Sequence, residues 1–172
     1  MTKSNRFFLA IALQVIIICA IAVFKLSVAS SGTEVLIHIR PVDPRDMLRG
    51  DYITFQYDIS QLPSYYLQYE RGSIPNPGET VYVSLYQSGR YWGVRTASLS
   101  RPTDGSVFLK GTVKSSNTQN ITVAYGAEEY FIPEGAGRNV SFWNKDAAAA
   151  LAVDDNGNSV LRRIYIDGKQ WP

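Results

Sequence analysis

A long apolar run near the start of the chain, residues 7–24, restricts the fold more than any other feature of the sequence. Gln14 is its one strongly polar residue, and no charged residue lies between Arg6 and Lys25. About 20 apolar residues in a helix, at 1.5 Å per residue, cross the roughly 30 Å hydrocarbon core of a bilayer. The run therefore predicts a transmembrane anchor in contact with lipid over residues 7–26, after a cytoplasmic tail over residues 1–6.

The charges that flank this run predict its orientation. Lys3, Arg6 and the amino terminus precede it, whereas only Lys25 follows closely. Because lysine and arginine keep flanking segments in the cytoplasm, we expect a single-pass protein of the inner membrane with its amino terminus inside. The rest of the chain then faces the periplasm or the cell exterior. A cleaved signal peptide is the alternative, since residues 27–29 end in small side chains, but the length of the run and the charge of Lys25 favour an uncleaved anchor.

Beyond a predicted linker over residues 27–33, the pattern changes to the period of two that is typical of β-strands. Val35, Ile37 and Ile39 alternate with larger or polar neighbours, and Phe55 and Tyr57 repeat the pattern in the next run. Similar runs separated by turn residues continue to the C-terminus. The predicted fold class is therefore mainly β, with one N-terminal transmembrane helix followed by a single antiparallel, barrel-like exported domain over residues 34–172.

Two local signals refine this prediction. Asn156-Gly157 lies between two strand-like runs, and this pair favours the positive φ angles of a tight hairpin turn. Residues 62–70 are aromatic and polar without alternation, and we expect one or two helical turns there.

Composition excludes several classes of site. Cys19 is the only cysteine and lies within the apolar run, so the exported part has no disulfide framework. His38 is the only histidine, and a zinc site built from one imidazole and carboxylates is uncommon. The net charge of +2 comes from scattered basic residues, which gives no indication of a nucleic-acid partner. We expect no metal and no cofactor.

A dense cluster of turn residues and charges lies between the first two predicted strands. Asp43 before Pro44 suits a type I turn, and a helical turn after it would place Arg45 and Arg49 on one face. This stretch is either a structural corner held by Asp–Arg pairs or a site that binds an anion or a protein partner. The residues of the candidate site are Asp43, Arg45, Asp46, Arg49, Asp51, Tyr52 and Tyr57.

A second cluster follows a later strand. Gly126 interrupts the strand pattern, which indicates a bulge or a close approach of the backbone, and Pro133-Glu134-Gly135 is typical of a turn. The candidate residues of this loop are Tyr125, Gly126, Glu129, Pro133, Glu134 and Gly135.

Two other kinds of site remain open. Asp51 with Glu128, Glu129 or Glu134 would supply the carboxylate pair of a hydrolase acting in the cell envelope, although the spacing does not bring them together. Exposed tyrosines would instead form a stacking platform for a sugar or a peptide, against the alternative that they pack across strands. The aromatic residues concerned are Tyr65, Tyr66, Tyr69, Tyr91 and Trp92.

The two clusters resemble those of the GDYXXLXY family, which are bacterial single-pass membrane proteins of unassigned activity. The naming motif occupies residues 50–57, with Phe55 in place of the leucine, and residues 124–137 resemble the family's second block. The resemblance implies an exported, membrane-tethered domain that is often encoded beside a multi-pass membrane protein, which becomes a candidate partner. It implies no reaction, and the expected function is a non-enzymatic interaction module acting with a membrane partner.

Overall fold

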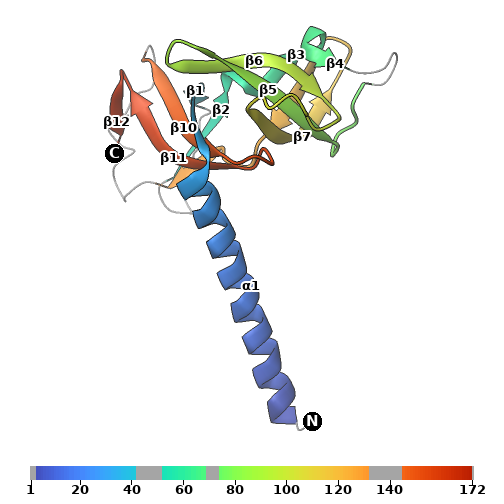
Figure 1. Ribbon diagram of the computed structural model, residues 1–172, viewed down its shortest axis with the longest axis vertical. Helices are drawn as coiled ribbons and strands as arrows, with labels where there is room; N and C mark the ends of the chain where they lie inside the picture. The colour runs from blue at the N-terminus through green and yellow to red at the C-terminus, as the bar shows by residue number, and fades with distance from the viewer. Residues whose placement is uncertain (1–2, 42–51, 69–73, 132–144, 172) are drawn as a thin grey trace.

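A long helix carries a β-domain at its C-terminal end (Figure 1). The computed structural model describes residues 3–41, 52–68, 74–131 and 145–171. In chain order, with η marking a 3-10 helix, the elements are α1 (Lys3–Ser31), β1 (Thr33–Pro41), β2 (Tyr52–Tyr57), η1 (Asp58–Ser60), β3 (Gln61–Pro63), η2 (Ser64–Tyr66), β4 (Leu67–Gln68), β5 (Thr80–Ser88), β6 (Tyr91–Ser98), β7 (Phe108–Ser116), β8 (Asn120–Ala124), β9 (Glu129–Phe131), β10 (Ala147–Val153), β11 (Ser159–Ile166) and β12 (Lys169–Trp171).

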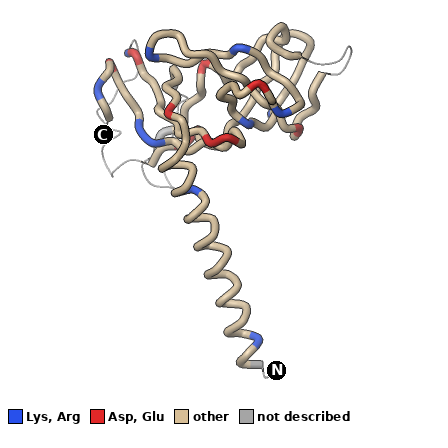
Figure 2. The backbone as a smooth tube through the Cα atoms, viewed as in Figure 1, with Lys and Arg blue, Asp and Glu red and all other residues tan. Residues whose placement is uncertain are grey.

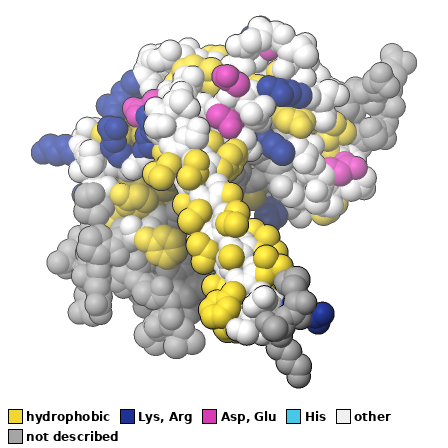
Figure 3. Space-filling view, turned by 60° about the horizontal axis from the view of Figure 1, so that its bottom comes forward, with side chains coloured by type: hydrophobic (Ala, Val, Ile, Leu, Met, Phe, Trp, Pro, Cys, Tyr) yellow, Lys and Arg dark blue, Asp and Glu magenta, His cyan; other side chains and the backbone are white. Residues whose placement is uncertain are grey.

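Helix α1 is apolar around its whole circumference along most of its length. No charged residue lies between Arg6 and Lys25 (Figure 2). Hydrophobic side chains cover the helix surface as far as the domain (Figure 3). Among the described residues it is the one helix long and apolar enough to cross a membrane, over Ser4–Ser31. The helix extends through most of the predicted linker, so that Gly32 alone separates it from β1.

The strands form two six-stranded sheets, and the mainly β fold class is confirmed. The first has the order β12-β11-β10-β1-β2-β9 and the second the order β3-β8-β7-β5-β6-β4. All pairs are antiparallel except β4 with β6. The chain passes between the sheets at η1, and both sheets curve in a barrel-like way around a common core.

The predicted faces of β1 and β2 are confirmed. Val35, Ile37 and Ile39 are buried, as are Phe55 and Tyr57, whereas Arg40, Gln56 and Asp58 between and beside them are exposed. These apolar side chains join those of the second sheet in one hydrophobic cluster. Alternation therefore identified the core face of both strands, as the two-residue period of a strand requires.

Strand β10 differs, because all seven of its residues are buried. Ala147, Ala149, Leu151 and Val153 join the core cluster, while Ala148, Ala150 and Ala152 face the other way and are also covered. A strand buried on both faces shows no alternation of apolar and polar residues. The run of alanines leaves room for the end of α1, which packs against β10 and β11.

The junction between α1 and the sheet is short and closely packed. Val28 is buried, and the Arg162 guanidinium of β11 donates two hydrogen bonds to the Ala29 carbonyl, that from Nε at 2.7 Å. A Cβ atom on residue 32 would lie 2.7 Å from the Val28 carbonyl oxygen and 2.8 Å from the Val153 nitrogen, so only glycine fits. The helix end is thus fixed to the sheet rather than tethered by a flexible segment.

The two local predictions have different outcomes. The hairpin at Asn156-Gly157 is confirmed, since β10 and β11 are antiparallel neighbours and Gly157 has a φ of +79°. Of the one or two helical turns expected over residues 62–70, one is present, the 3-10 turn η2, and it is flanked by the short strands β3 and β4 rather than continued as a helix. Pairing of these strands with β8 and β6 replaces the hydrogen bonds that a helix would have made.

Candidate functional site

The candidate residues divide between described and undescribed parts of the chain. Tyr52, Tyr57, Tyr125, Gly126 and Glu129 lie in the described part. The other candidates lie outside the described residues: Asp43, Arg45, Asp46, Arg49 and Asp51 of the first cluster, and Pro133, Glu134 and Gly135 of the second.

Strand pairing brings the two clusters together. In the register of β2 and β9, Tyr52 is opposite Phe131 and Thr54 is opposite Glu129, and the Phe55 amide donates to the Glu128 carbonyl at 3.1 Å. The chain therefore enters β2 and leaves β9 at paired residues. One end of each undescribed segment, 42–51 and 132–144, is therefore joined to the described chain at the same end of the β2–β9 pair.

Two buried tyrosines connect the end of β2 to the loop that precedes β9. The Tyr57 hydroxyl donates to the Ala127 carbonyl, and the Tyr125 hydroxyl donates to the Ile59 carbonyl at 2.7 Å. Their rings meet edge to face, with centroids 5.9 Å apart and planes at 80°. The two hydrogen bonds therefore connect residues 57–59 with residues 125–127 in both directions. They also give each buried hydroxyl the hydrogen-bond partner that it needs.

Burial also changes the acidity of both phenols. Burial, and next the negative charge of Glu128, raise the pKa of Tyr57 well above its ordinary value. The same two causes, in the same order, raise the pKa of Tyr125. Both hydroxyls therefore remain protonated hydrogen-bond donors at neutral pH, which makes their role structural rather than that of a general base.

The loop between Tyr125 and Glu129 is a tight turn. Gly126 has a φ of +77°, and an added Cβ there would meet nothing within 4 Å. The glycine supplies a left-handed backbone conformation rather than the close approach that the strand pattern suggested. The Glu128 carboxylate accepts a hydrogen bond from the Tyr125 amide, so this carboxylate serves the turn.

A second tyrosine-centred cluster joins the two sheets, and no local sequence pattern predicts it. The Tyr91 hydroxyl of β6 donates to the Asp146 carboxylate at 2.5 Å, and Nδ1 of His38 in β1 lies 3.2 Å from the other oxygen of that carboxylate. The His38 and Tyr91 rings stack with centroids 3.9 Å apart. Partial burial, and next the bond to Asp146, raise the pKa of Tyr91.

This cluster holds a histidine in the orientation used in catalytic triads, but it lacks the other parts of such a site. Asp146 fixes one imidazole nitrogen, as the acid of a triad does. Among the described residues, no hydroxyl or thiol is hydrogen-bonded to the other nitrogen of His38. No group of three or more His, Cys, Asp or Glu residues within the described ranges is arranged to hold a metal ion.

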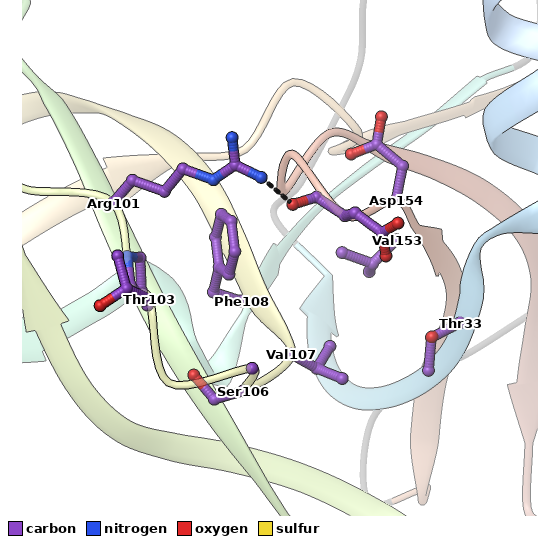
Figure 4. A pocket seen from close by; sticks show the side chains of 11 residues that line it. Thr33, Arg101, Thr103, Ser106, Val107, Phe108, Val153 and Asp154 are labelled. Atoms are coloured by element: carbon purple, nitrogen blue, oxygen red, sulfur yellow. Dashed lines mark hydrogen bonds between the residues drawn. The ribbon is translucent and has the colours of Figure 1, made fainter.

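A depression of about 400 Å³ lies between the β6–β7 loop and the β10–β11 turn, beside the start of β1 (Figure 4). Two of its charged side chains, Arg101 and Asp154, are already used by the fold. The Arg101 guanidinium donates to the Asp155 carbonyl at 2.7 Å and lies over the Phe108 ring, and the Asp154 carboxylate accepts from the Asn156 and Asn158 amides. The Arg101 and Asp154 side chains are therefore occupied by contacts within the fold and are not free for a ligand.

The aromatic residues considered for a stacking platform differ in exposure. Tyr65 is 77% exposed and its ring lies 4.6 Å from that of Tyr66, while Tyr86 is 51% exposed. A hydrogen bond with Tyr65 raises the pKa of Tyr66. Tyr91 and Trp92, by contrast, pack against His38 and the core respectively, and Tyr69 lies outside the described residues.

These features define a class: a two-sheet β-domain fixed without a flexible linker to one helix that could span a membrane. The model of the family described as GDYXXLXY protein matches residues 14–164, and the chain belongs to this family. No curated protein and no solved structure matches it. The match covers α1 from Gln14 onward and both clusters, so most of the helix and the β-domain belong to a single family pattern.

Proposed function

We propose that this protein is a membrane-anchored, non-enzymatic interaction module that contacts a membrane partner through the corner at β2 and β9. The observation that carries the proposal is the pairing of Tyr52 with Phe131. This pair lies where the chain leaves each candidate cluster and enters or ends a strand. Two buried tyrosine hydroxyls fix this edge. A fixed strand pair that continues in sequence into both candidate segments suits recognition of a partner surface.

The proposed location follows from the charges around α1. Lys3 and Arg6 precede the apolar span, whereas Lys25 follows it, which supports an amino terminus in the cytoplasm and a domain in the periplasm or outside the cell. The proposed units are residues 1–6 as tail, 7–26 as anchor, 27–33 as connection and 34–172 as exported domain.

A double substitution tests the role of the corner. Arg45→Ala with Arg49→Ala, made in the full-length protein, should lower recovery of a co-purifying membrane partner at least tenfold, because two guanidinium contacts are lost. Arg90→Ala with Arg95→Ala removes the same charge from the β5–β6 hairpin and should leave recovery unchanged. If the Arg45/Arg49 variant unfolds, or recovers as much partner as the control, these arginines are not the contact.

The exposure of Tyr65 favours a second candidate function, binding of a saccharide. Tyr65, stacked on Tyr66, lies at the β3–β4 end of the domain, away from the point where α1 joins it (Figure 1). A flat, uncharged ring with a hydroxyl at its rim matches the apolar face of a pyranose. Titration with tri-N-acetylglucosamine, followed by NMR, should give binding that Tyr65→Ala abolishes and that Phe131→Ala, an exposed aromatic residue of the other sheet, leaves intact.

The carboxylate-hydrolase alternative has less support in the described residues. The Glu128 side chain is bound to the Tyr125 amide, and Glu129 is exposed on β9. Asp51 and Glu134, the other carboxylates of that hypothesis, lie outside the described residues.

A further inference from the structure

The junction between α1 and the β-domain determines how close the base of the domain lies to a membrane. The apolar span, residues 7–24, has a length of about 27 Å at 1.5 Å per residue, close to the roughly 30 Å of a hydrocarbon core. Lys25 therefore lies at the edge of the hydrocarbon. The head-group layer occupies about the next 5–8 Å, and the last turns of the helix, up to Ser31, cross it. Because Gly32 alone separates α1 from β1, the side chains packed around these turns lie at head-group depth.

Lys25 is a cation on the flank of the span where, in the proposed orientation, lysine and arginine are disfavoured. Its side chain is exposed, and it makes no hydrogen bond or ion pair with any residue that the structure describes. A lysine at the end of a transmembrane helix extends along the apolar surface until its ammonium reaches the polar layer. The ammonium of Lys25 is therefore available to a group outside the chain, at the depth of the lipid phosphates.

Arg162 of β11 brings a second cation to the same side of the helix. Its Nε donates to the Ala29 carbonyl at 2.7 Å. Ala29 follows Lys25 by four residues, so the two lie within about 40° of each other around the helix axis and about 6 Å apart along it. The Arg162 side chain is 22% exposed, so its guanidinium is held by the fold and is still in contact with the surroundings.

Arg163 adds a third cation, and the two arginines share one carboxylate. Oε2 of Glu34 lies 3.3 Å from Nη1 of Arg162 and 3.9 Å from Nη2 of Arg163, whose side chain is 43% exposed. The acidic residues of the β10–β11 turn, Asp154 and Asp155, are about 10 Å or more from Arg162 along the strand, roughly one Debye length. Among the described residues, this side of the helix end therefore has more positive than negative charge.

We propose that Lys25, Arg162 and Arg163 bind the head-group phosphate of an anionic phospholipid at the base of the β-domain. Guanidinium groups bind phosphate oxygens in pairs, and the flexible Lys25 chain adds a point charge from the helix. The excess of positive charge favours a lipid with a net negative charge over a zwitterionic lipid, whose phosphate is paired with its own choline. The proposal rests on one part of the proposed function, namely that α1 spans a membrane.

Native mass spectrometry of the full-length protein tests this site. The protein is released from nanodiscs that contain equal amounts of dioleoylphosphatidylcholine and dioleoylphosphatidylglycerol, and the retained lipids are counted. Wild-type protein should retain phosphatidylglycerol at least about fivefold over phosphatidylcholine, the factor expected from one cation near a bilayer surface. Lys25→Gln with Arg163→Gln should lower this ratio below about twofold, whereas Lys25→Arg with Arg163→Lys should keep it. Arg162 is left unchanged because it also holds the junction.

A matched control removes two cations from the part of the domain distant from the helix end. Arg90 and Arg95 flank β6 residues near Tyr91, which stacks on His38. His38 is five residues beyond Thr33 in β1, about 17 Å along the strand. Arg90→Gln with Arg95→Gln should therefore leave the ratio of the two lipids unchanged.

The outcomes separate this inference from the proposed function. Equal retention of the two lipids by wild-type protein, or the same loss in the control variant, would overturn the inference and leave the β2–β9 corner as the partner site. Displacement of the retained lipid by millimolar glycerol 3-phosphate would also overturn it, because the site would then bind free phosphate esters. Failure of the chain to enter nanodiscs would overturn the membrane anchor as well. Unchanged thermal unfolding of the Lys25→Gln/Arg163→Gln variant shows that a lower ratio does not come from misfolding.

Discussion

Two tyrosine-centred contacts join distant parts of the β-domain, and they differ in how much water reaches them. Tyr57 and Tyr125 lie in the core, where their hydroxyls bond to backbone carbonyls. Tyr91 lies at the surface, where it shares a carboxylate with a half-exposed histidine. A buried hydrogen bond has no solvent to replace it, whereas water can replace a hydrogen bond to an exposed carboxylate at little cost. Perturbing the two contacts should therefore give very different changes in stability.

The largest difference in stability between the two tyrosine contacts is expected at high pH. Since burial raises the folded-state pKa of Tyr57 and Tyr125, their stabilising effect is fully present below about pH 10, the unfolded value, and is lost as pH rises from there toward the folded pKa. Each buried phenol costs up to about 1.4 kcal/mol per pH unit in this window. Denaturant unfolding of the detergent-solubilised protein between pH 9 and 12 measures this loss. An identical pH dependence in the Tyr57→Phe/Tyr125→Phe double variant would contradict this origin.

Truncation of a buried ring should come next in magnitude. Tyr125→Ala removes a buried aromatic side chain and leaves a cavity, and should lower the free energy of unfolding by about 3–5 kcal/mol. Tyr65→Ala, at an exposed ring, is the matched control and should change it by less than about 0.5 kcal/mol. Thermal and denaturant unfolding of both variants give the comparison, and equal losses would show that the corner is not part of the core.

Removal of the hydroxyl alone should have an intermediate effect. Tyr57→Phe keeps the ring but leaves the Ala127 carbonyl buried without its donor, at a cost of about 1–3 kcal/mol. Tyr91→Phe leaves the Asp146 carboxylate in contact with water and should cost less than half as much. A larger loss at Tyr91 than at Tyr57 would reverse the proposed ranking.

The smallest effect is expected at the half-exposed contact between Asp146 and His38. Asp146→Asn should lower the free energy of unfolding by less than about 1 kcal/mol, because both side chains of the pair are largely accessible to water. Denaturant unfolding measures this change. A loss larger than that of Tyr57→Phe would contradict the ranking.

Local pattern predicted much of the fold but little of these contacts. Alternation identified the buried face of β1 and β2, and Asn156-Gly157 identified the β10–β11 hairpin, because both depend on neighbouring residues. The bond from Tyr57 to Ala127 spans 70 positions of sequence, and no spacing rule connects them. The division into two sheets has the same origin: it depends on where η1 carries the chain across the core.

The alanine run shows a different limit. Ala147–Val153 lacks polar residues, so its pattern cannot reveal that α1 packs against one of its faces. The side chain that completes this junction, Arg162, comes from β11 and resembles any other strand arginine in the sequence. Of the residues expected to form the site, only those nearest the strands, Tyr52, Tyr57, Tyr125, Gly126 and Glu129, lie in the described part of the chain.

Because α1 passes directly into the sheet, the helix and the β-domain must change orientation together. The helix has 29 residues and a length of about 44 Å, and it passes into β1 through one glycine. Transmembrane helices change tilt when bilayer thickness or neighbouring helices change. A change of 10° displaces one end of such a helix by about 8 Å relative to the other, and the domain must turn with it. If α1 spans a bilayer, a change in its tilt therefore changes the direction in which the end of the β2–β9 pair points.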